Sequence, residues 1–183
     1  MTLSDAVLMT ASVDDPLAFG EVFDRYVRLV RRYAARRLGE DRADDATAET
    51  FGIAFERRAA FDAGRGELRS WLLGIATNVI RNYSREEDRR MRALGHFDVD
   101  AGDVGVEVEH AFFAAPEVGA ALAALEPGDR DVLVLVAWED MTYQQVADAL
   151  DIPLGTVRSR LHRARQLLRA SLGAHLDEED VHG

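Results

Sequence analysis

Apolar residues recur at intervals of three and four along the first half of the chain, and this spacing constrains the fold more than any other feature. The runs extend from Leu17 to Leu38, from about residue 44 to 60, and from about residue 67 to 91. Side chains at this spacing share one face of an α-helix. Residues 62–66 include two glycines and predict a loop between the last two helices. No strand-like alternation appears, so residues 17–95 are expected to form an all-α bundle.

The segment at 96–115 differs from both of its neighbours. It holds five acids, no Arg and little helical spacing, which predicts a flexible acidic linker. Beyond it, residues 116–173 regain helical spacing and predict a second small helical domain. Residues 1–16 are expected to be an N-terminal tail and residues 174–183 an acidic C-terminal tail. The predicted fold class is therefore all-α, with two small helical domains joined by the linker.

The second domain contains a pair of helices with a recognisable start and break. Thr142-Tyr-Gln-Gln145 matches the S/T-x-x-E/Q capping box, in which side chains pair with free backbone donors at a helix start. The helix that it opens is about two turns long, because residues 151–155 (DIPLG) interrupt it. A longer, basic helix is expected from Gly155 to about Leu172. Two helices joined by a tight turn, the second one basic, are typical of a helix-turn-helix.

Charge is sorted into blocks along the chain. The net charge is −11, yet residues 154–173 hold five Arg and no acid, and residues 25–42 hold seven Arg and two acids. Residues 116–153, in contrast, carry −7, from eight acids and one Arg. A phosphate backbone responds to the local patch and not to the total charge. The acidic total therefore does not exclude nucleic acid as a partner.

Several classes of protein are disfavoured by what the sequence lacks. There is no cysteine, which excludes disulfides and thiolate metal sites, and the five His have no metal-ligand spacing. No nucleotide-binding glycine loop or nucleophile elbow is present. We therefore expect no metal, no cofactor and no enzymatic activity. The N-terminus does not resemble a signal peptide and no apolar run approaches the length of a membrane span, so a cytoplasmic protein without membrane insertion is expected.

The basic helix after Gly155 has two distinct faces. Val157, Leu161, Ala164 and Leu168 fall on one narrow arc and predict the face that packs against the preceding helix. The opposite arc carries Thr156, Ser159, His162, Arg163 and Gln166, and Arg158, Arg160 and Arg165 flank the apolar stripe. In a major groove the far arc would meet base edges and the flanking Arg would meet phosphates. The alternative is a solvated basic face on a core helix, but five Arg without an acid favour DNA.

The residues TYQQVADALDIPLGTVRSRLHRARQLLR, which start at Thr142, resemble the second conserved domain of extracytoplasmic-function sigma factors, the small group of the sigma-70 family. The resemblance implies a protein that binds RNA polymerase core and directs promoter recognition and transcription initiation. The family reads the −35 promoter element with this helix. By position, its base-reading and phosphate-contacting residues fall on Arg158, Ser159, His162 and Arg163. The family often has another residue where this chain has His162, so the preferred −35 bases stay open.

Two segments of the first half resemble the other conserved domain of the same family. Residues 43–51 (ADDATAETF) resemble the part that grips the clamp coiled coil of the polymerase β′ subunit, although Leu and Gln are common in the family where this chain has Ala46 and Ala48. The resemblance implies that Asp44, Asp45, Glu49 and Phe51 bind polymerase. Without the resemblance, the acidic residues of such a helix would usually be interpreted as a surface that faces water.

Residues 70–78 (SWLLGIATN) resemble the helix that supports −10 recognition, where the family traps a flipped base beneath a loop. That loop would be residues 61–67 here, and the matching pocket residues would be Phe61 and Asn78. Phe offers a stacking face and Asn can hydrogen-bond a base edge. Arg81 and Arg85 follow on the same helix and could hold phosphates of melted DNA.

The resemblance also implies further partners: the polymerase β subunit and a protein inhibitor, an anti-sigma factor. A different interpretation is a helix-turn-helix regulator that acts without core polymerase, because the C-terminal helices alone would fit one. A receiver domain in the first half would need alternating strands and helices, whereas the pattern there is helical throughout. A phosphate-handling enzyme has no motif in its favour.

Overall fold

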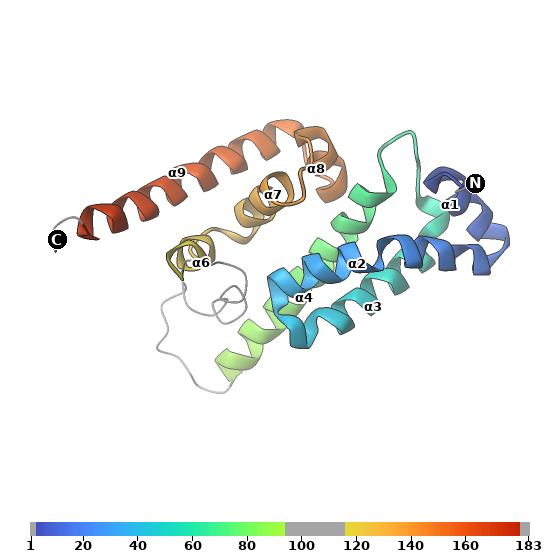
Figure 1. Ribbon diagram of the computed structural model, residues 1–183, viewed down its shortest axis with the longest axis horizontal. Helices are drawn as coiled ribbons and strands as arrows, with labels where there is room; N and C mark the ends of the chain where they lie inside the picture. Colours follow the sequence, from blue (N-terminus) through green and yellow to red (C-terminus); the bar gives the residue numbers. More distant parts are fainter. Residues whose placement is uncertain (1–2, 94–115, 180–183) are drawn as a thin grey trace.

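The computed structural model describes residues 3–93 and 116–179, and the predicted acidic linker at 96–115 lies outside the described residues. The first part of the chain contains α1 (Asp5–Asp14), η1 (Pro16–Ala18), α2 (Phe19–Leu38), α3 (Glu40–Glu56), η2 (Arg58–Ala60) and α4 (Leu68–Ala93). The second part contains α6 (Pro116–Ala123), α7 (Pro127–Ala137), α8 (Tyr143–Leu150) and α9 (Leu154–Glu179). The described residues include no strand, and Figure 1 shows two groups of helices, which confirms the all-α fold class.

The three predicted helices of the first part correspond to α2, α3 and α4. Gly39 joins α2 to α3 with a φ of 81°, a conformation that glycine adopts without a steric penalty. The apolar stripes meet in the core, where Val30, Tyr33 and Leu72 are among the fully buried side chains. Tyr33 keeps its hydroxyl hydrogen-bonded there, 2.8 Å from the Oγ1 of Thr77, as a buried polar group requires.

The predicted N-terminal tail contains a helix that is part of the core. Ser4 caps α1 by accepting a hydrogen bond from the backbone N–H of Val7. Leu8 and Met9 are buried, and the guanidinium of Arg58 in η2, which packs against α1, donates to the carbonyl of Ser12. The helix was not predicted because its apolar residues do not form a single stripe.

The second part begins its short helix as predicted. Thr142 Oγ1 accepts from the Gln145 N–H at 3.2 Å, and Gln145 Oε1 accepts from the Thr142 N–H at 2.8 Å, so the capping box is confirmed. Asp151 ends α8 with a φ of 51°, in the left-handed conformation. The next helix, α9, starts at Leu154 and continues to Glu179, so it extends into the stretch predicted as an acidic tail.

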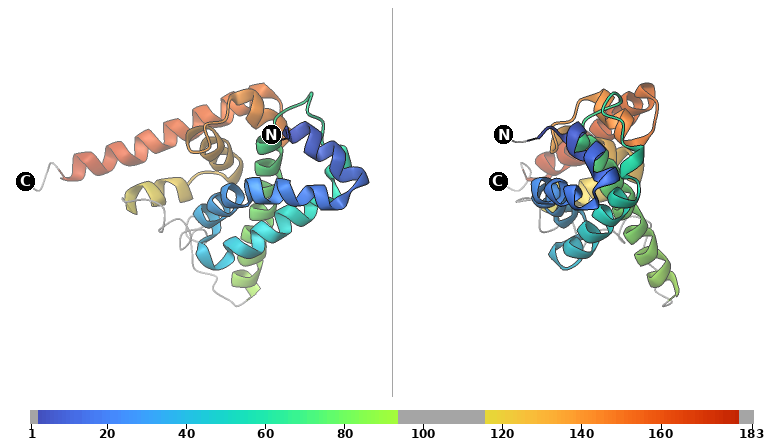
Figure 2. Two further views of the ribbon diagram at one scale, coloured as in Figure 1. Left: turned by 45° about the vertical axis from the view of Figure 1, so that its right-hand side comes forward. Right: turned by 90° about the vertical axis from the view of Figure 1, so that its right-hand side faces the viewer.

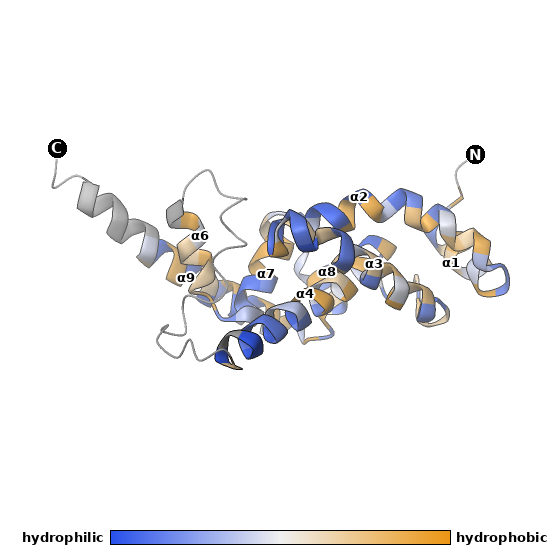
Figure 3. Cartoon of the chain, turned by 90° about the horizontal axis from the view of Figure 1, so that it is seen from below, coloured by the Kyte–Doolittle hydropathy of each residue, from blue (hydrophilic) through white to orange (hydrophobic). Residues whose placement is uncertain are grey.

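The two groups of helices lie against each other. α8 packs on the N-terminal half of α4, and both views of Figure 2 keep these helices side by side. Gly74 of α4 allows this contact, because a Cβ there would lie 2.2 Å from the carbonyl oxygen of Ala149. Beyond the contact, the C-terminal end of α4 is hydrophilic (Figure 3) and carries exposed Arg85, Arg89 and Arg90.

Candidate nucleic-acid interface

The first half of α9 separates an apolar face from a basic one, as the sequence predicts. Val157, Leu161 and Ala164 are at most 2% exposed and pack against α6, α7 and α8. The polar arc faces solvent: Arg158, Ser159, His162 and Arg163 are exposed, and Thr156 and Arg160 are half-buried. The helix therefore presents an accessible row of side chains on a rigid support, which is the geometry that reading a major groove needs.

Two of the Arg side chains of α9 contact the start of α7. Arg163 donates from Nε and Nη2 to the two carboxylate oxygens of Asp129, at 2.9 and 2.7 Å. This hydrogen-bonded pair raises the pKa of Arg163 above its ordinary value. Arg160 lies over Gly128, where an added Cβ would come within 2.8 Å of the guanidinium. In this arrangement Arg163 is engaged within its own domain.

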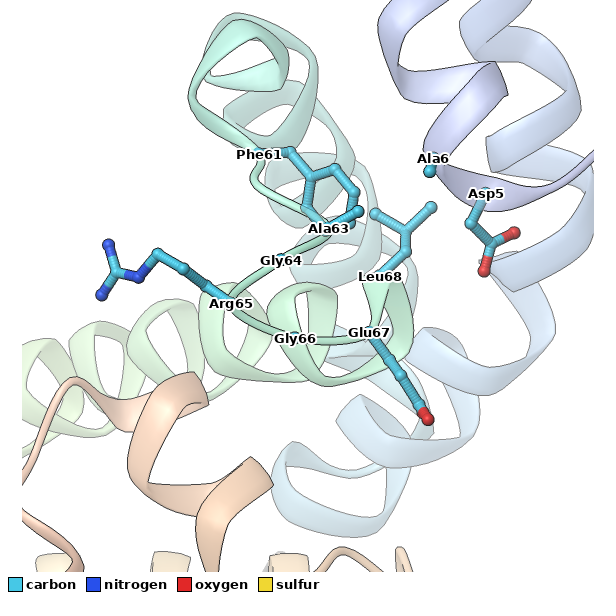
Figure 4. A pocket seen from close by; sticks show the side chains of 9 residues that line it. All are labelled: Asp5, Ala6, Phe61, Ala63, Gly64, Arg65, Gly66, Glu67 and Leu68. Atoms are coloured by element: carbon cyan, nitrogen blue, oxygen red, sulfur yellow. The ribbon is translucent and has the colours of Figure 1, made fainter.

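The loop between η2 and α4 borders an open cavity of about 390 Å³ (Figure 4). The cavity is lined by Asp5, Ala6, Phe61, Ala63, Gly64, Arg65, Gly66, Glu67 and Leu68. The Phe61 ring packs edge-on against Trp71, with ring centroids 5.5 Å apart. Gly64 donates its N–H to the Asp62 carboxylate at 2.8 Å, which stabilises the loop turn.

The N-terminal helix contributes a wall of this cavity that the sequence did not predict. Asp5 faces the loop from α1, and its carboxylate accepts hydrogen bonds from Arg25 and from the Tyr26 hydroxyl. Burial and this bond raise the pKa of Tyr26 above its ordinary value. Arg65 points away from the cavity in Figure 4. The helical cap at Ser4 was the one sequence signal that could have revealed this wall.

Asn78, which the sequence placed in the same pocket as Phe61, is not among the residues that line the cavity. It is exposed on α4, two turns beyond Trp71. At 100° per residue, Gly74, Asn78, Arg81 and Arg85 fall within an arc of about 60° around α4. Asn78 therefore shares a face with the two predicted phosphate contacts, and this face is the one on which α8 packs.

The candidate polymerase-binding residues on α3 divide into two groups. Asp44, Asp45 and Glu49 are exposed, and Asp44 accepts from the Nε of Arg31 at 2.7 Å. Phe51 is only 5% exposed and lies in the core between rings of α2. Phe51, which the resemblance implies binds polymerase, therefore lies in the core and not on the exposed face of α3. Phe23 of α2, whose ring centroid is 4.9 Å from that of Phe51, is 40% exposed and was missed by the sequence analysis.

Two buried carboxylates of the second part lie against α2 and α4. Asp131 of α7 is completely buried and accepts from Arg37 Nη2 at 2.7 Å and from Arg81 Nε at 2.5 Å. Glu139, directly after α7, is 1% exposed and accepts from Arg69 at 3.0 Å. These pairs were not predicted from the sequence. Arg81 is thus held by the other domain.

Across residues 3–93 and 116–179, no group of three or more His, Asp or Glu side chains is arranged to hold a metal ion. Within the same ranges, no helix is both long and apolar enough to cross a bilayer.

Comparison with known proteins identifies both parts of the chain. Residues 22–90 match the family model for sigma-70 region 2, and residues 116–168 match the model for sigma-70 region 4. The chain is 36% identical over 166 residues to the ECF RNA polymerase sigma factor SigE of Mycolicibacterium smegmatis, covering 88% of this chain and 64% of that protein. It is 32% identical to the ECF RNA polymerase sigma factor EcfG of Rhodopseudomonas palustris, covering 72% of each.

A solved structure supports the same assignment. CnrH, determined in complex with the cytosolic domain of CnrY, superposes with a TM-score of 0.65 at 27% identity and covers 93% of this chain and 97% of its own. The two matched domains, in this order, together with relatives that the chain matches over most of their length, show that it belongs to the extracytoplasmic-function group of the sigma-70 family of RNA polymerase sigma factors.

Proposed function

We propose that this sigma factor reads the −35 element with α9 and the melted −10 element with α4 and the loop at 61–67. The observation that carries the −35 assignment is the exposed arc of α9, supported by the fully buried Val157 and Leu161. Arg158 and Arg160 contact phosphates beside the groove, and Thr156, Ser159, His162 and Arg163 contact base edges or adjacent phosphates. Arg163 must leave Asp129 to do so.

The −10 site combines the open cavity with the face of α4 that carries Asn78, Arg81 and Arg85, which the second domain partly covers in this structure. A base flipped into the cavity stacks on Phe61, and the cavity volume of about 390 Å³ suits a small planar ligand. Asn78 contacts the strand that leads to the cavity, and Arg81 and Arg85 bind its phosphates. Asn78, Arg81 and Arg85 lie on one arc of α4, which supports their contact with a single DNA strand.

The exposed acids of α3 form the polymerase-binding surface. Asp44, Asp45 and Glu49 are exposed and suit a basic helix such as that of the β′ clamp, which would compete with Arg31 for Asp44, and Phe23 adds an exposed ring from the adjacent helix. The second domain contacts the β subunit. The protein performs no chemistry of its own and acts in the cytoplasm, where polymerase is found.

An anti-sigma factor is the third partner. CnrH, a structural relative, was determined with the cytosolic domain of CnrY bound. A protein of two tethered helical domains offers several surfaces for such a partner to cover. Affinity capture of the native protein under non-inducing conditions should recover an additional small protein besides polymerase subunits. Recovery of polymerase subunits alone would contradict this part of the proposal.

Reconstitution with purified core polymerase tests the main proposal. The protein should elute with core in gel filtration and support transcription from its own promoter, while the free protein should bind that promoter poorly because Asp129 and Asp131 engage Arg163 and Arg81. Glu49→Arg should abolish elution with core, and Glu56→Arg, at the exposed end of the same helix, is the matched control. A specific nanomolar complex of the free protein with promoter duplex would favour an independent regulator.

A further inference from the structure

Five arginines of the first domain form one surface, which we call the arginine surface: Arg32, Arg36 and Arg37 of α2 and Arg69 and Arg81 of α4. All five make ion pairs with carboxylates of the second domain. α8 packs on α4 (Figures 1 and 2), and the ion pairs of Asp131 connect α7 to α2 and α4. Like charges gathered so closely need anions nearby, because their mutual repulsion would otherwise oppose folding.

Asp131 forms ion pairs with two arginines of this surface, Arg37 and Arg81. Its two oxygens are used separately, Oδ1 by Arg37 and Oδ2 by Arg81, and the carboxylate is completely removed from solvent. An oxyanion bridging two guanidinium groups in this way is the arrangement that Arg makes with phosphate as well as with carboxylate. Arg81 thereby has the same kind of partner in this closed form that it is proposed to have on DNA.

Glu139 forms ion pairs with the other three arginines. Its Oε2 lies 3.0 Å from Arg69 and 4.0 Å from Arg32, and its Oε1 lies 3.4 Å from Arg36. The carboxylate is 1% exposed, whereas Arg32 remains 55% exposed. The surface is therefore only partly covered, and its outer edge is open to an incoming anion.

The location of the surface indicates which anion it takes. Arg81 lies on the same arc of α4 as Asn78 and Arg85, the residues proposed to follow the promoter strand. Arg32 and Arg36 extend that path onto α2, away from the cavity at Phe61. A continuous row of Arg leading from a base-reading site is what the phosphates of an adjoining DNA segment would contact.

We propose that the arginine surface is a second phosphate-binding surface for promoter DNA, which Asp131 and Glu139 occupy until the two domains separate. The inference rests on the proposed function and adds Arg32, Arg36, Arg37 and Arg69 to the DNA path. The closed form and the DNA complex are then mutually exclusive, because one set of guanidinium groups cannot bind carboxylates and phosphates together.

The salt dependence of promoter binding by holoenzyme tests the proposal. Each phosphate contact contributes about 0.9 to the slope of log affinity against log salt on duplex DNA and about 0.7 on single strands. The double variant Arg32→Ala/Arg36→Ala should lower the magnitude of this slope by about 1 to 2. The control is Arg57→Ala, which removes one charge from an exposed position off the surface and should leave the slope unchanged.

A second experiment removes the charges of the two carboxylates, and here the proposal predicts a gain in DNA binding. In the free protein, Asp131→Asn/Glu139→Gln should release the surface and raise affinity for a duplex of non-promoter sequence at least about fivefold. This arm remains informative if the arginine variant fails to fold, since it measures a gain in binding.

The outcomes separate the alternatives. A slope equal to that of wild type in the folded arginine variant, or no gain in the carboxylate variant, overturns the inference. If the carboxylate variant instead binds a polyglutamate peptide more tightly than duplex, the surface takes an acidic protein segment and the inference is again overturned. A wild-type holoenzyme that does not form or transcribe refutes the proposed function, whereas a transcribing holoenzyme with an unchanged slope refutes only this inference.

Discussion

Replacing Gly74 by alanine should open the closed form without weakening either domain. The added Cβ would lie 2.2 Å from the carbonyl oxygen of Ala149, 2.9 Å from its carbonyl carbon and 3.1 Å from its Cα. All three atoms belong to the backbone of α8, so no side-chain rotation relieves the clash. Optimal contacts between heavy atoms lie at about 3.5–4.0 Å. α8 must therefore move by about 1 Å or leave α4.

The free-energy cost of that clash can be compared with the gain in helix propensity when alanine replaces glycine. Forcing an extra carbon into a packed contact costs about 1–3 kcal/mol, which corresponds to a shift of about 5- to 150-fold from the closed to the open form. Within α4 itself, alanine is about 1 kcal/mol more favourable than glycine in a helix interior. The first domain should thus become slightly more stable while the contact between domains weakens.

Fluorescence energy transfer between the domains measures the effect. The chain has no cysteine, so labels can be attached at Glu56→Cys and Gln166→Cys, which are exposed on α3 and α9. Gly74→Ala should lower the transfer efficiency. Gly52→Ala is the control, because a Cβ at that helical glycine meets nothing within 4 Å. Unchanged transfer in a folded Gly74→Ala protein would refute the reasoning that this backbone contact holds the domains together.

The remaining predictions concern the two DNA-reading sites, a buried carboxyl group and the core of the second domain. In holoenzyme, Arg163→Ala should weaken closed-complex binding by about 1–3 kcal/mol and relax preference within the −35 element. Asn78→Ala should leave duplex binding nearly intact and slow strand opening, as measured by permanganate footprinting; equal losses on duplex that pre-melting does not rescue would contradict this division. Burial raises the pKa of Glu139, so the folded state binds the proton more tightly than the unfolded state and this group's contribution to stability falls as pH rises through its folded pKa. Glu139→Gln should remove that slope in urea titrations carried out at pH values above 4.5, the ordinary pKa of a Glu side chain, and parallel wild-type and variant curves would argue against it. Leu161→Ala should lower the free energy of unfolding by about 2–5 kcal/mol, and a melting temperature equal to that of wild type would show that the α9 stripe is not part of the core.

The helices of both domains could be predicted because their signals are local. A buried stripe at three- and four-residue spacing is visible in sequence wherever one face of a helix meets a core, as for Val157, Leu161 and Ala164. The capping box at Thr142 is likewise complete within four residues. These signals also fixed which side of α9 faces solvent.

Features that depend on the neighbours of a helix were missed. The sequence does not show that α1 covers the loop at 61–67, because that contact joins residues about sixty positions apart. Phe51 was assigned to a surface since a single helix cannot show that Phe19 and Phe23 enclose one of its rings. Asn78 was placed beside Phe61 by resemblance, whereas the helical rise of α4 carries it out of the cavity lining.

The acidic stretch at 116–153 shows most clearly what a charge count leaves out. Its net charge of −7 includes Asp129, which engages Arg163 of α9 and so competes with DNA for that side chain. Asp131, two residues later, points instead to the other domain. Asp131 directly precedes the apolar run Val132 to Ala137 of α7, and a carboxylate buried with that run needs a cation. The adjacent Arg130 is engaged by the carbonyls of Leu122, Ala123 and Leu125, so the cation had to come from elsewhere.

Because buried ion pairs make up part of the contact between the domains, the net stability of that contact can be judged. Buried ion pairs return little net stability, because the cost of removing both charges from water offsets most of their attraction. Separating α7 from α2 and α4 rehydrates Asp131 and the guanidinium groups of Arg37 and Arg81, which recovers that cost. The pairs therefore specify one orientation of the domains more than they stabilise it. A partner that binds the open form needs only a modest difference in affinity to shift the population, and the proposed exchange of carboxylates for DNA phosphates depends on such a shift.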